Sequence, residues 1–164
     1  MLYKDRYDAA LKLIPFLKKY KDENCVILAV PRGGIPIAYY IAKYYKFPLE
    51  LLLAKKIGHP WNPELAIGAV SLEDTIIDER HTIPKPYITN AIKQIRKALA
   101  ERQKKFMGDR MPVDIKNKTV IVIDDGVATG NTLEAAVKLI AKKQPQRIVV
   151  AVPVAPVEAK EKFN

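Results

Sequence analysis

The stretch "VIVIDDGVATGNTLEAA", from Val120 to Ala136, joins an apolar run, two adjacent acids, a small-residue loop and the start of an amphipathic helix. Four consecutive apolar residues predict a strand that is buried on both faces, as the strands of parallel sheets are. The loop that follows leads directly into a helix. Repeated along a chain, such strand–loop–helix units build an open sheet of mainly parallel strands.

Strand and helix patterns alternate along the rest of the chain, so we predict an α/β fold: an open, mainly parallel sheet with helices on both faces. Pro15 can kink the first helix, and Thr89 or Asn90 can cap the longest one. No repeat or low-complexity tract interrupts the pattern. The expected strands are residues 25–30, 48–54, 64–71, 119–124 and 147–154, and the expected helices are residues 8–20, 35–45, 88–106 and 133–143.

Length and composition fit one soluble domain that spans residues 1–164. A chain of 164 residues with 49% hydrophobic composition can bury one sizeable core and is short for two ordinary domains. Its apolar runs are shorter than the roughly 18 residues that a membrane span needs, and the N-terminus lacks a signal-peptide pattern. We therefore expect a cytoplasmic protein without a membrane partner. Cys25 is the single cysteine, so the chain cannot form an internal disulfide, and we expect this residue in the core.

The charge is strongly positive. The chain has 28 Lys and Arg residues against 18 Asp and Glu, a net charge of +10, which suggests an anionic partner such as a polyphosphate, a nucleic acid or a membrane surface. Eight basic and two acidic residues lie between Lys85 and Arg110. A charged helix of this kind is most often a solvated face. The sequence also lacks the paired aromatics of a common single-strand platform, which disfavours nucleic acid as a partner.

Asp124 and Asp125 follow the central apolar run. Two neighbouring carboxylates at a strand end repel each other unless they meet hydroxyl donors or a cation. A ribose diol together with a magnesium ion would satisfy both acids. In open parallel sheets, ligands bind beyond the carboxyl ends of the strands, which is where this pair and the "PRGGIP" loop of residues 31–36 are expected.

The loop after the two acids is suited to a phosphate. Backbone N–H groups and the positive end of the helix dipole favour an anion where a loop enters a helix. Glycine permits close approach, and threonine hydroxyls can donate hydrogen bonds to phosphate oxygens. The chain has neither the lysine of a Walker loop nor a G-x-G-x-x-G fingerprint. The residues assigned to this phosphate are Ala128, Thr129, Gly130, Asn131 and Thr132.

On these residues the chain resembles the type I phosphoribosyltransferases, whose signature "VIVIDDGVATGNT" matches in order. The segments "YKDRYDAALKL", "VILAVPRGGIPIA", "KKIGHPWNPELAIGAV" and "VVAVPVAP" extend the resemblance, to a branch of predicted phosphoribosyltransferases, over nearly the whole chain. The resemblance implies that Asp124 and Asp125 bind the ribose of phosphoribosyl pyrophosphate (PRPP) and that the following loop binds its 5-phosphate. That branch usually continues through a further strand and tail, whereas this chain stops at Asn164. We therefore expect a shortened C-terminal hood.

The same resemblance makes "PRGG" the pyrophosphate loop. Arg32 would meet the pyrophosphate as a fork of donors, and Gly33 and Gly34 would present backbone N–H groups. The resemblance also implies a cis peptide between Pro31 and Arg32. Two lysines, Lys55 and Lys56, are expected to close the second strand, and since side chains alternate along a strand, only one of them should face the pyrophosphate.

By the same resemblance, residues 58–68, "GHPWNPELAIG", and the charged stretch after them would correspond to the mobile region that covers the site during the reaction in this family. His59 is a candidate acid or hydrogen-bond donor, although a loop histidine is more often polar surface. Trp61 can shield the site or merely pack, and the role of Glu64 is equally undecided.

The implied reaction is transfer of the phosphoribosyl group from PRPP to an unidentified acceptor with release of pyrophosphate. Mg²⁺ is the implied cofactor, with Asp124 and Asp125 as its ligands, and Arg32, Asp124 and Asp125 are the implied catalytic residues. Purine-salvage relatives place an aspartate where this chain has Ala128, so hypoxanthine and guanine are expected to be poor acceptors. Two alternatives stay open: a PRPP- or nucleotide-binding regulatory domain without transferase activity, and a nucleic-acid-associated sensor. A homo-oligomer also stays open.

Overall fold

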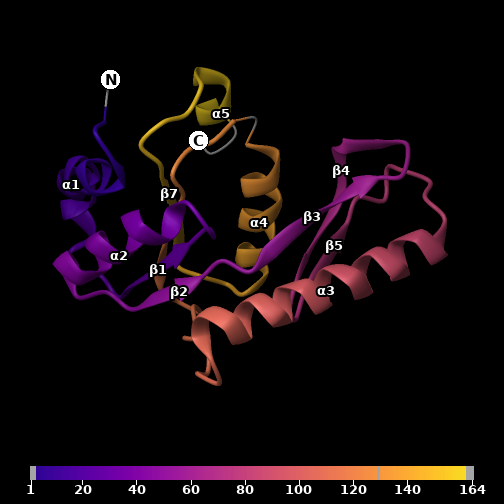
Figure 1. Ribbon diagram of the computed structural model, residues 1–164, viewed down its shortest axis with the longest axis horizontal. Coiled ribbons are helices and arrows are strands. Elements are labelled where there is room, and N and C mark those ends of the chain that lie inside the picture. The colour runs from indigo at the N-terminus through magenta and orange to yellow at the C-terminus, as the bar shows by residue number, and fades with distance from the viewer. Residues whose placement is uncertain (1–2, 129, 162–164) are drawn as a thin grey trace. The chain divides into compact units, whose positions relative to one another are not determined.

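The computed structural model describes residues 3–128 and 130–161, and the chain divides into two compact units (Figure 1). The first unit contains a parallel sheet and comprises Met1–Leu52, Pro112–Gly130 and Lys143–Asn164. The second contains an antiparallel sheet and comprises Leu53–Met111 and Asn131–Lys142. We call them the parallel unit and the antiparallel unit. That residues 1–164 form a single domain stays a prediction.

The parallel unit is built on a four-stranded sheet in the order β2 (Leu49–Leu51), β1 (Cys25–Ala29), β6 (Thr119–Ile123), β7 (Arg147–Ala151). All three pairings are parallel. Every residue of β1 and of β6 is buried, which is why both strands appear in the sequence as uninterrupted apolar runs. The prediction of an α/β protein with a mainly parallel central sheet is confirmed.

Helices α1 (Arg6–Leu17) and α2 (Gly34–Tyr45) pack together on this sheet. Alternate residues of β1 and β6 face them, and the residues in between are equally buried on the opposite face. The unit also contains the short helices η1 (Lys18–Tyr20) and α5 (Val157–Glu161). The core that α1 and α2 share with the sheet includes Ala10, Ile14, Ile27, Ile37, Ile41, Ile121 and Ile123.

Cys25 lies in this core at the start of β1, as expected. Its thiol donates to the carbonyl oxygen of Tyr20 at 3.3 Å. Burial raises the pKa of the Cys25 thiol to about 11, so it stays protonated and unreactive at neutral pH.

The antiparallel unit contains the strands β3 (Ala54–His59), β4 (Asn62–Ser71) and β5 (Thr75–Ile77), paired in that order. Helices α3 (Lys85–Met107) and α4 (Asn131–Lys142) pack on them. Figure 1 shows α3 as one long helix that runs along these strands. A small core forms where Ile57, Ile67 and Val70 meet the apolar side of α3, which contributes Ala91, Ile92 and Ile95.

The prediction of one continuous second strand over residues 48–54 is wrong. β2 ends at Leu51, and a separate strand, β3, begins at Ala54 and pairs with β4 instead of β1. Lys55 and Lys56 therefore lie in β3 and do not close the second parallel strand. The apolar run passes through Leu52 without a Gly or Pro, so the sequence carries no turn signal at this point. β5 was not expected, because three residues are too few for a periodic pattern.

The prediction that Thr89 or Asn90 caps the start of the long helix is also wrong. α3 begins at Lys85, and Thr89 and Asn90 lie inside it. Pro86 explains the earlier start: proline has no N–H to lose in the first turn and its φ angle suits a helix. None of the helices in the described ranges is long and apolar enough to cross a membrane.

Candidate functional site

The site expected from the sequence lies where β1 and β6 end. The two strands are parallel neighbours, with β2 beyond one and β7 beyond the other, so the strand order reverses between them. Ligands bind at such a switch point in open parallel sheets. The backbone N–H of Val30 donates to the carbonyl oxygen of Ile123 at 2.8 Å, which extends the pairing by one residue. The loops that follow the two strands therefore start side by side.

The first loop contains Arg32. The peptide between Pro31 and Arg32 is cis, and this prediction is confirmed. Arg32 is exposed, and α2 begins two residues later at Gly34. The N–H of Gly34 donates to the carbonyl oxygen of Val30 at 3.0 Å. The contact of Arg32 with a pyrophosphate stays a prediction.

The two glycines of this loop are required by packing against the second loop. A Cβ atom on Gly34 would lie 2.5 Å from the carbonyl oxygen of Ile123. One on Gly33 would lie 1.9 Å from Oδ2 of Asp125, well inside van der Waals contact. The sequence suggested glycine for its N–H groups. The structure adds that a side chain at Gly33 would displace the Asp125 carboxylate, whereas one at Gly34 would meet the backbone of Ile123 and Asp124.

The second loop begins with the two acids. The backbone N–H of Asp125 donates to Oδ1 of Asp124 at 2.8 Å. Burial raises the pKa of Asp124 to about 6, and the neighbouring Asp125 charge acts in the same direction, while the backbone hydrogen bond opposes both. A cation or hydroxyl donors at this carboxylate would relieve its poor solvation.

Asp125 has a partner that the sequence did not suggest. Nη2 of Arg6, the first residue of α1, lies 2.7 Å from Oδ2 of Asp125. The two residues are 119 positions apart, so no local pattern could relate them. The one available signal was a basic residue at the start of a helix, where the dipole favours an acid.

The rest of the second loop leads toward α4. The N–H of Val127 donates to the carbonyl oxygen of Val154 at 3.0 Å, which ties the loop to the segment after β7. Ala128 is exposed. Gly130 has a φ of +76°, a conformation that glycine adopts without steric penalty. The expected contact of Thr129 with a phosphate falls outside the described residues.

Asn131 and Thr132 are the first two residues of α4, as expected for a loop that enters a helix. Glu134 follows in the first turn and pairs with Lys138 at 2.7 Å. These residues belong to the antiparallel unit. The contact of Asn131 and Thr132 with a phosphate stays a prediction.

The two lysines assigned to the pyrophosphate also lie in the antiparallel unit. Lys55 is exposed, whereas Nζ of Lys56 lies 3.2 Å from Oε2 of Glu64 across the β3–β4 pair. The two side chains differ in their surroundings, as alternation along a strand requires. Glu64, whose role was undecided, is thus the ion-pair partner of Lys56.

His59 ends β3 close to two other rings. Its Nδ1 accepts the backbone N–H of Trp61 at 3.3 Å, which leaves Nε2 as the nitrogen that carries the proton in the neutral ring. The ring of His81 lies 5.9 Å away, centroid to centroid. Trp61 is 76% exposed, so its ring is available to cover a ligand and contributes little to the core.

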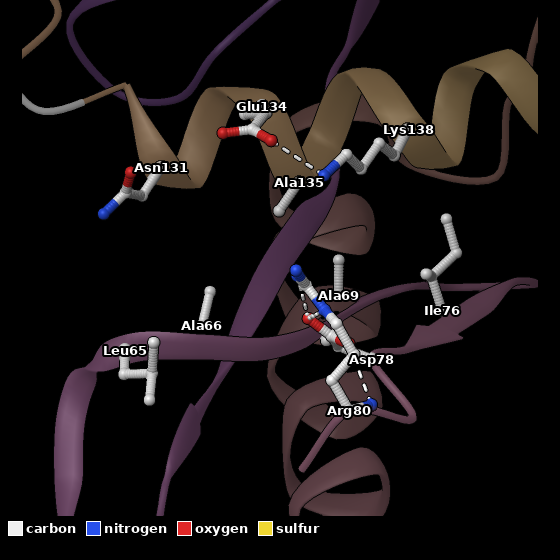
Figure 2. A pocket seen from close by; sticks show the side chains of 11 residues that line it. Leu65, Ala66, Ala69, Ile76, Asp78, Arg80, Asn131, Glu134, Ala135 and Lys138 are labelled. Atoms are coloured by element: carbon white, nitrogen blue, oxygen red, sulfur yellow. Dashed lines mark hydrogen bonds and ion pairs between the residues drawn. The ribbon is translucent and has the colours of Figure 1, made fainter. Parts of the chain in front are cut away.

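A pocket of about 220 Å³ lies within the antiparallel unit, between β4, β5 and α4 (Figure 2). Two ion pairs border it: Arg80 with Asp78, at 2.6 Å, and Lys138 with Glu134. Hydrogen bonds from Arg80 hold the pKa of Asp78 well below its usual range. Asn131, one of the predicted phosphate-binding residues, lines the same pocket. The first residue of α4 therefore belongs both to the predicted site and to this pocket.

Comparison with known proteins gives consistent results. The family described as "Phosphoribosyl transferase domain" matches residues 5–162. A predicted phosphoribosyl transferase of Mycobacterium tuberculosis strain H37Rv is 32% identical over 168 residues, which cover 99% of this chain. The chain spans 38% of the length of that protein, and the same share of the matching protein from strain CDC 1551.

Solved structures agree. The crystal structure of TT1426 from Thermus thermophilus has a TM-score of 0.87 and 34% identity, covering 99% of this chain and 79% of the other. A purine phosphoribosyltransferase from Pyrococcus horikoshii has a TM-score of 0.50 and 22% identity, covering 88% and 68%, a likeness of fold alone. Because one family matches nearly the full length and includes both loops of the site, the chain belongs to the phosphoribosyl transferase domain family.

Proposed function

We propose that the protein is a phosphoribosyltransferase that binds PRPP with Mg²⁺ and transfers the phosphoribosyl group to an acceptor, with release of pyrophosphate. One observation carries the proposal beyond family membership. The loop of residues 31–34 packs directly on the acid pair, with Gly33 against the Asp125 carboxylate. This contact supports the proposal, because the loop that would bind the pyrophosphate and the acids that would bind the ribose diol must lie next to each other for a sugar with a pyrophosphate on C1.

The two carboxylates suit a ribose diol. Oδ1 of Asp124 accepts a backbone N–H, and Oδ2 of Asp125 accepts the Arg6 guanidinium. Each acid therefore keeps a second oxygen that can accept a hydrogen bond from one of the two adjacent hydroxyls of the sugar.

The acid pair also fits Mg²⁺ that arrives with the substrate. Magnesium prefers oxygen ligands, keeps several waters and is usually bound by one or two carboxylates together with substrate phosphates. Among residues 3–128 and 130–161, no group of three or more His, Cys, Asp or Glu side chains is placed to hold a metal ion alone. Asp124 and Asp125 would hold it, and its charge would stabilise the departing pyrophosphate.

The protein's own residues would mainly position and stabilise charge. Arg32 would bind the pyrophosphate while the bond from C1 to its oxygen breaks. Asp124 and Asp125 would orient the ribose, and their negative charge would favour the positive charge that develops on the ring. The acceptor would attack C1 from the opposite side, so holding both ligands in line supplies much of the rate.

Ala128 narrows the choice of acceptor. Its exposed methyl group can neither donate nor accept a hydrogen bond, so it cannot assist a purine ring as the aspartate of purine-salvage relatives does. We expect little turnover with hypoxanthine or guanine.

A cytoplasmic location also stays a prediction.

The deciding experiment measures pyrophosphate release from PRPP and Mg²⁺ with hypoxanthine, guanine, adenine, orotate and uracil. Release with one acceptor establishes the enzyme and names its substrate. PRPP binding without release for any acceptor would support a regulatory domain instead, and rapid turnover of hypoxanthine or guanine would contradict the argument from Ala128.

A binding experiment tests the acid pair. The double variant Asp124→Asn, Asp125→Asn should lose most of its PRPP affinity in a calorimetric titration and keep its fold, because a repulsive pair is removed. Asp114→Asn is a control, since Asp114 is an exposed acid of the same unit whose Oδ1 accepts the local N–H of Lys116. Unchanged PRPP affinity in the double variant would rule out the sugar-site assignment.

A further inference from the structure

The contact between Arg6 and Asp125 joins α1 to the acid pair. The start of α1 is held firmly: Asp5 caps it by accepting the N–H of Asp8 at 2.8 Å. Ala9 and Ala10, in the first turns, are buried in the core shared with α2. Arg6 therefore projects from a fixed backbone position.

Neither the helix nor the fold accounts for an arginine at this position. A positive charge at the first residue of a helix is disfavoured by the helix dipole. The side chains of Arg6 and Asp125 are 55% and 37% exposed, and ion pairs with that much solvent contribute little to folding. The pair is well suited to a role at the site, because it lies at the acid expected to bind the sugar.

Arg6 fixes which oxygen of Asp125 faces a ligand. Its guanidinium takes Oδ2, while the whole carboxylate group, with both of its oxygens, packs close to Gly33. A carboxylate that is held through one oxygen by an arginine and packs against a glycine backbone keeps its other oxygen, Oδ1, in a defined direction. A planar guanidinium sets the direction of its hydrogen bond more strictly than an ammonium group does.

We propose that Arg6 is a positioning residue of the sugar site: it holds Asp125 so that Oδ1 accepts a hydrogen bond from a ribose hydroxyl of PRPP. The inference rests on the proposed function. It makes α1 part of the site and assigns Arg6 no direct contact with the substrate.

The test is a double-mutant cycle on the dissociation constant of PRPP with Mg²⁺, measured by calorimetry. Arg6→Gln should weaken binding about tenfold, the lower end of the effect of outer residues that orient a ligand-binding carboxylate. Because Arg6 acts through Asp125, the double variant Arg6→Gln, Asp125→Asn should bind no more weakly than Asp125→Asn alone. Arg6→Lys should recover part of the loss, since it restores charge without the fork.

Lys12→Gln is the matched control. Lys12 lies on the same helix, is 52% exposed and forms an ion pair at 3.0 Å with Asp8, an acid outside the pair. It should leave PRPP affinity unchanged. Thermal unfolding of Arg6→Gln and Lys12→Gln should differ little, which separates a role at the site from one in folding.

The outcomes are distinct. Wild-type protein that binds neither PRPP nor ribose 5-phosphate would overturn the proposed function and this inference with it. Wild-type protein that binds PRPP, while Arg6→Gln binds equally well or the cycle is additive, would overturn the role of Arg6 alone.

Discussion

The side chain that Gly33 lacks would occupy the place of the Asp125 carboxylate. Here the requirement for glycine comes from a neighbour far along the chain, because the contact joins the loops after β1 and β6. The orientation of the Asp125 side chain therefore depends on the absence of a side chain at residue 33. Each of the two loops limits what the other can contain.

Gly33→Ala should consequently impair the site more than the fold. The new Cβ would lie 1.9 Å from Oδ2 of Asp125, so the carboxylate must leave the position in which it accepts the hydrogen bond of Arg6. We expect PRPP affinity to fall at least about tenfold, the effect of misplacing a ligand-binding carboxylate. Gly126→Ala is the control in the second loop, since among the residues that the structure describes its Cβ would meet only the carbonyl oxygen of Val154, at 3.6 Å. Equal affinities for the two variants, by calorimetry, would contradict the packing argument.

Asp124 makes stability depend on pH. Its pKa of about 6 lies above the ordinary value of 3.8, so the folded protein binds this proton more tightly than the unfolded chain. The contribution of Asp124 to stability therefore falls as the pH rises from the ordinary pKa to the raised one. Asn at this position cannot ionise. After a discount for partial exposure, Asp124→Asn should raise the free energy of unfolding by about 1 kcal/mol at pH 7.5.

At pH 4 the gain from Asp124→Asn should be small, because the wild-type carboxyl is then protonated in the folded protein. Urea unfolding at the two pH values measures the difference, with Asp114→Asn as the control variant. A gain that is larger at pH 4 than at pH 7.5 would show that burial does not raise this pKa.

At the scale of elements, the long helix α3 contains basic residues with two different roles. Most are exposed, in agreement with a solvated face. Arg96 is half-buried, and its Nη2 donates to the carbonyl oxygen of Glu73 at 3.3 Å and to Oγ1 of Thr75 at 3.0 Å. It thus fastens α3 to the β4–β5 turn. The positive charge of this segment cannot be read as one uniform binding surface.

Arg96→Gln should therefore lower the free energy of unfolding by about 1–2 kcal/mol, since three hydrogen bonds from a charged group are lost, the third being from Nε to the carbonyl oxygen of Ser71 at 3.4 Å. Lys97→Gln, at the adjacent exposed position, should change it by less than about 0.5 kcal/mol. Chemical denaturation followed by circular dichroism compares the two variants. Similar small changes in both would mean that Arg96 is only a solvated charge.

The elements that the sequence predicted well are those whose signal is local. β1 and β6 are apolar runs buried on both faces, and the loop after β6 enters α4 at Asn131, as its small residues suggested. The break between β2 and β3 was missed, because it lies in an uninterrupted apolar run and depends on which strand each half pairs with. Arg6 was missed for the same physical reason: its partner is chosen by tertiary packing.

At the scale of the whole molecule, each unit has its own core. The parallel unit is centred on β1, β6, α1 and α2, whereas the antiparallel unit has the small core of Ile57, Ile67 and Val70. A single cooperative domain, as predicted from the chain length, would spread the effect of a defect in either core over both units.

Ile67→Ala tests this cooperativity. Ile67 is fully buried, so the variant should lose about 2–4 kcal/mol of unfolding free energy. Hydrogen exchange should then report the same loss of protection in β1 and β6 as in β3 and β4. Leu65→Ala, at an exposed position of β4, should have little effect on either unit. A loss confined to the antiparallel unit would show that the two units unfold separately.

The hydrogen bonds that Asp124 and Asp125 already accept have a consequence for sugar selectivity. Each acid has one oxygen engaged by the protein, and the other oxygens, Oδ2 of Asp124 and Oδ1 of Asp125, can accept hydrogen bonds from hydroxyls on two neighbouring carbons of a sugar. A deoxyribose would leave one of these acceptors unsatisfied, and sites built to bond a hydroxyl reject analogues that lack it. Ribose 5-phosphate should accordingly compete with PRPP far better than 2-deoxyribose 5-phosphate. The same two residues would then separate the sugar of RNA from that of DNA.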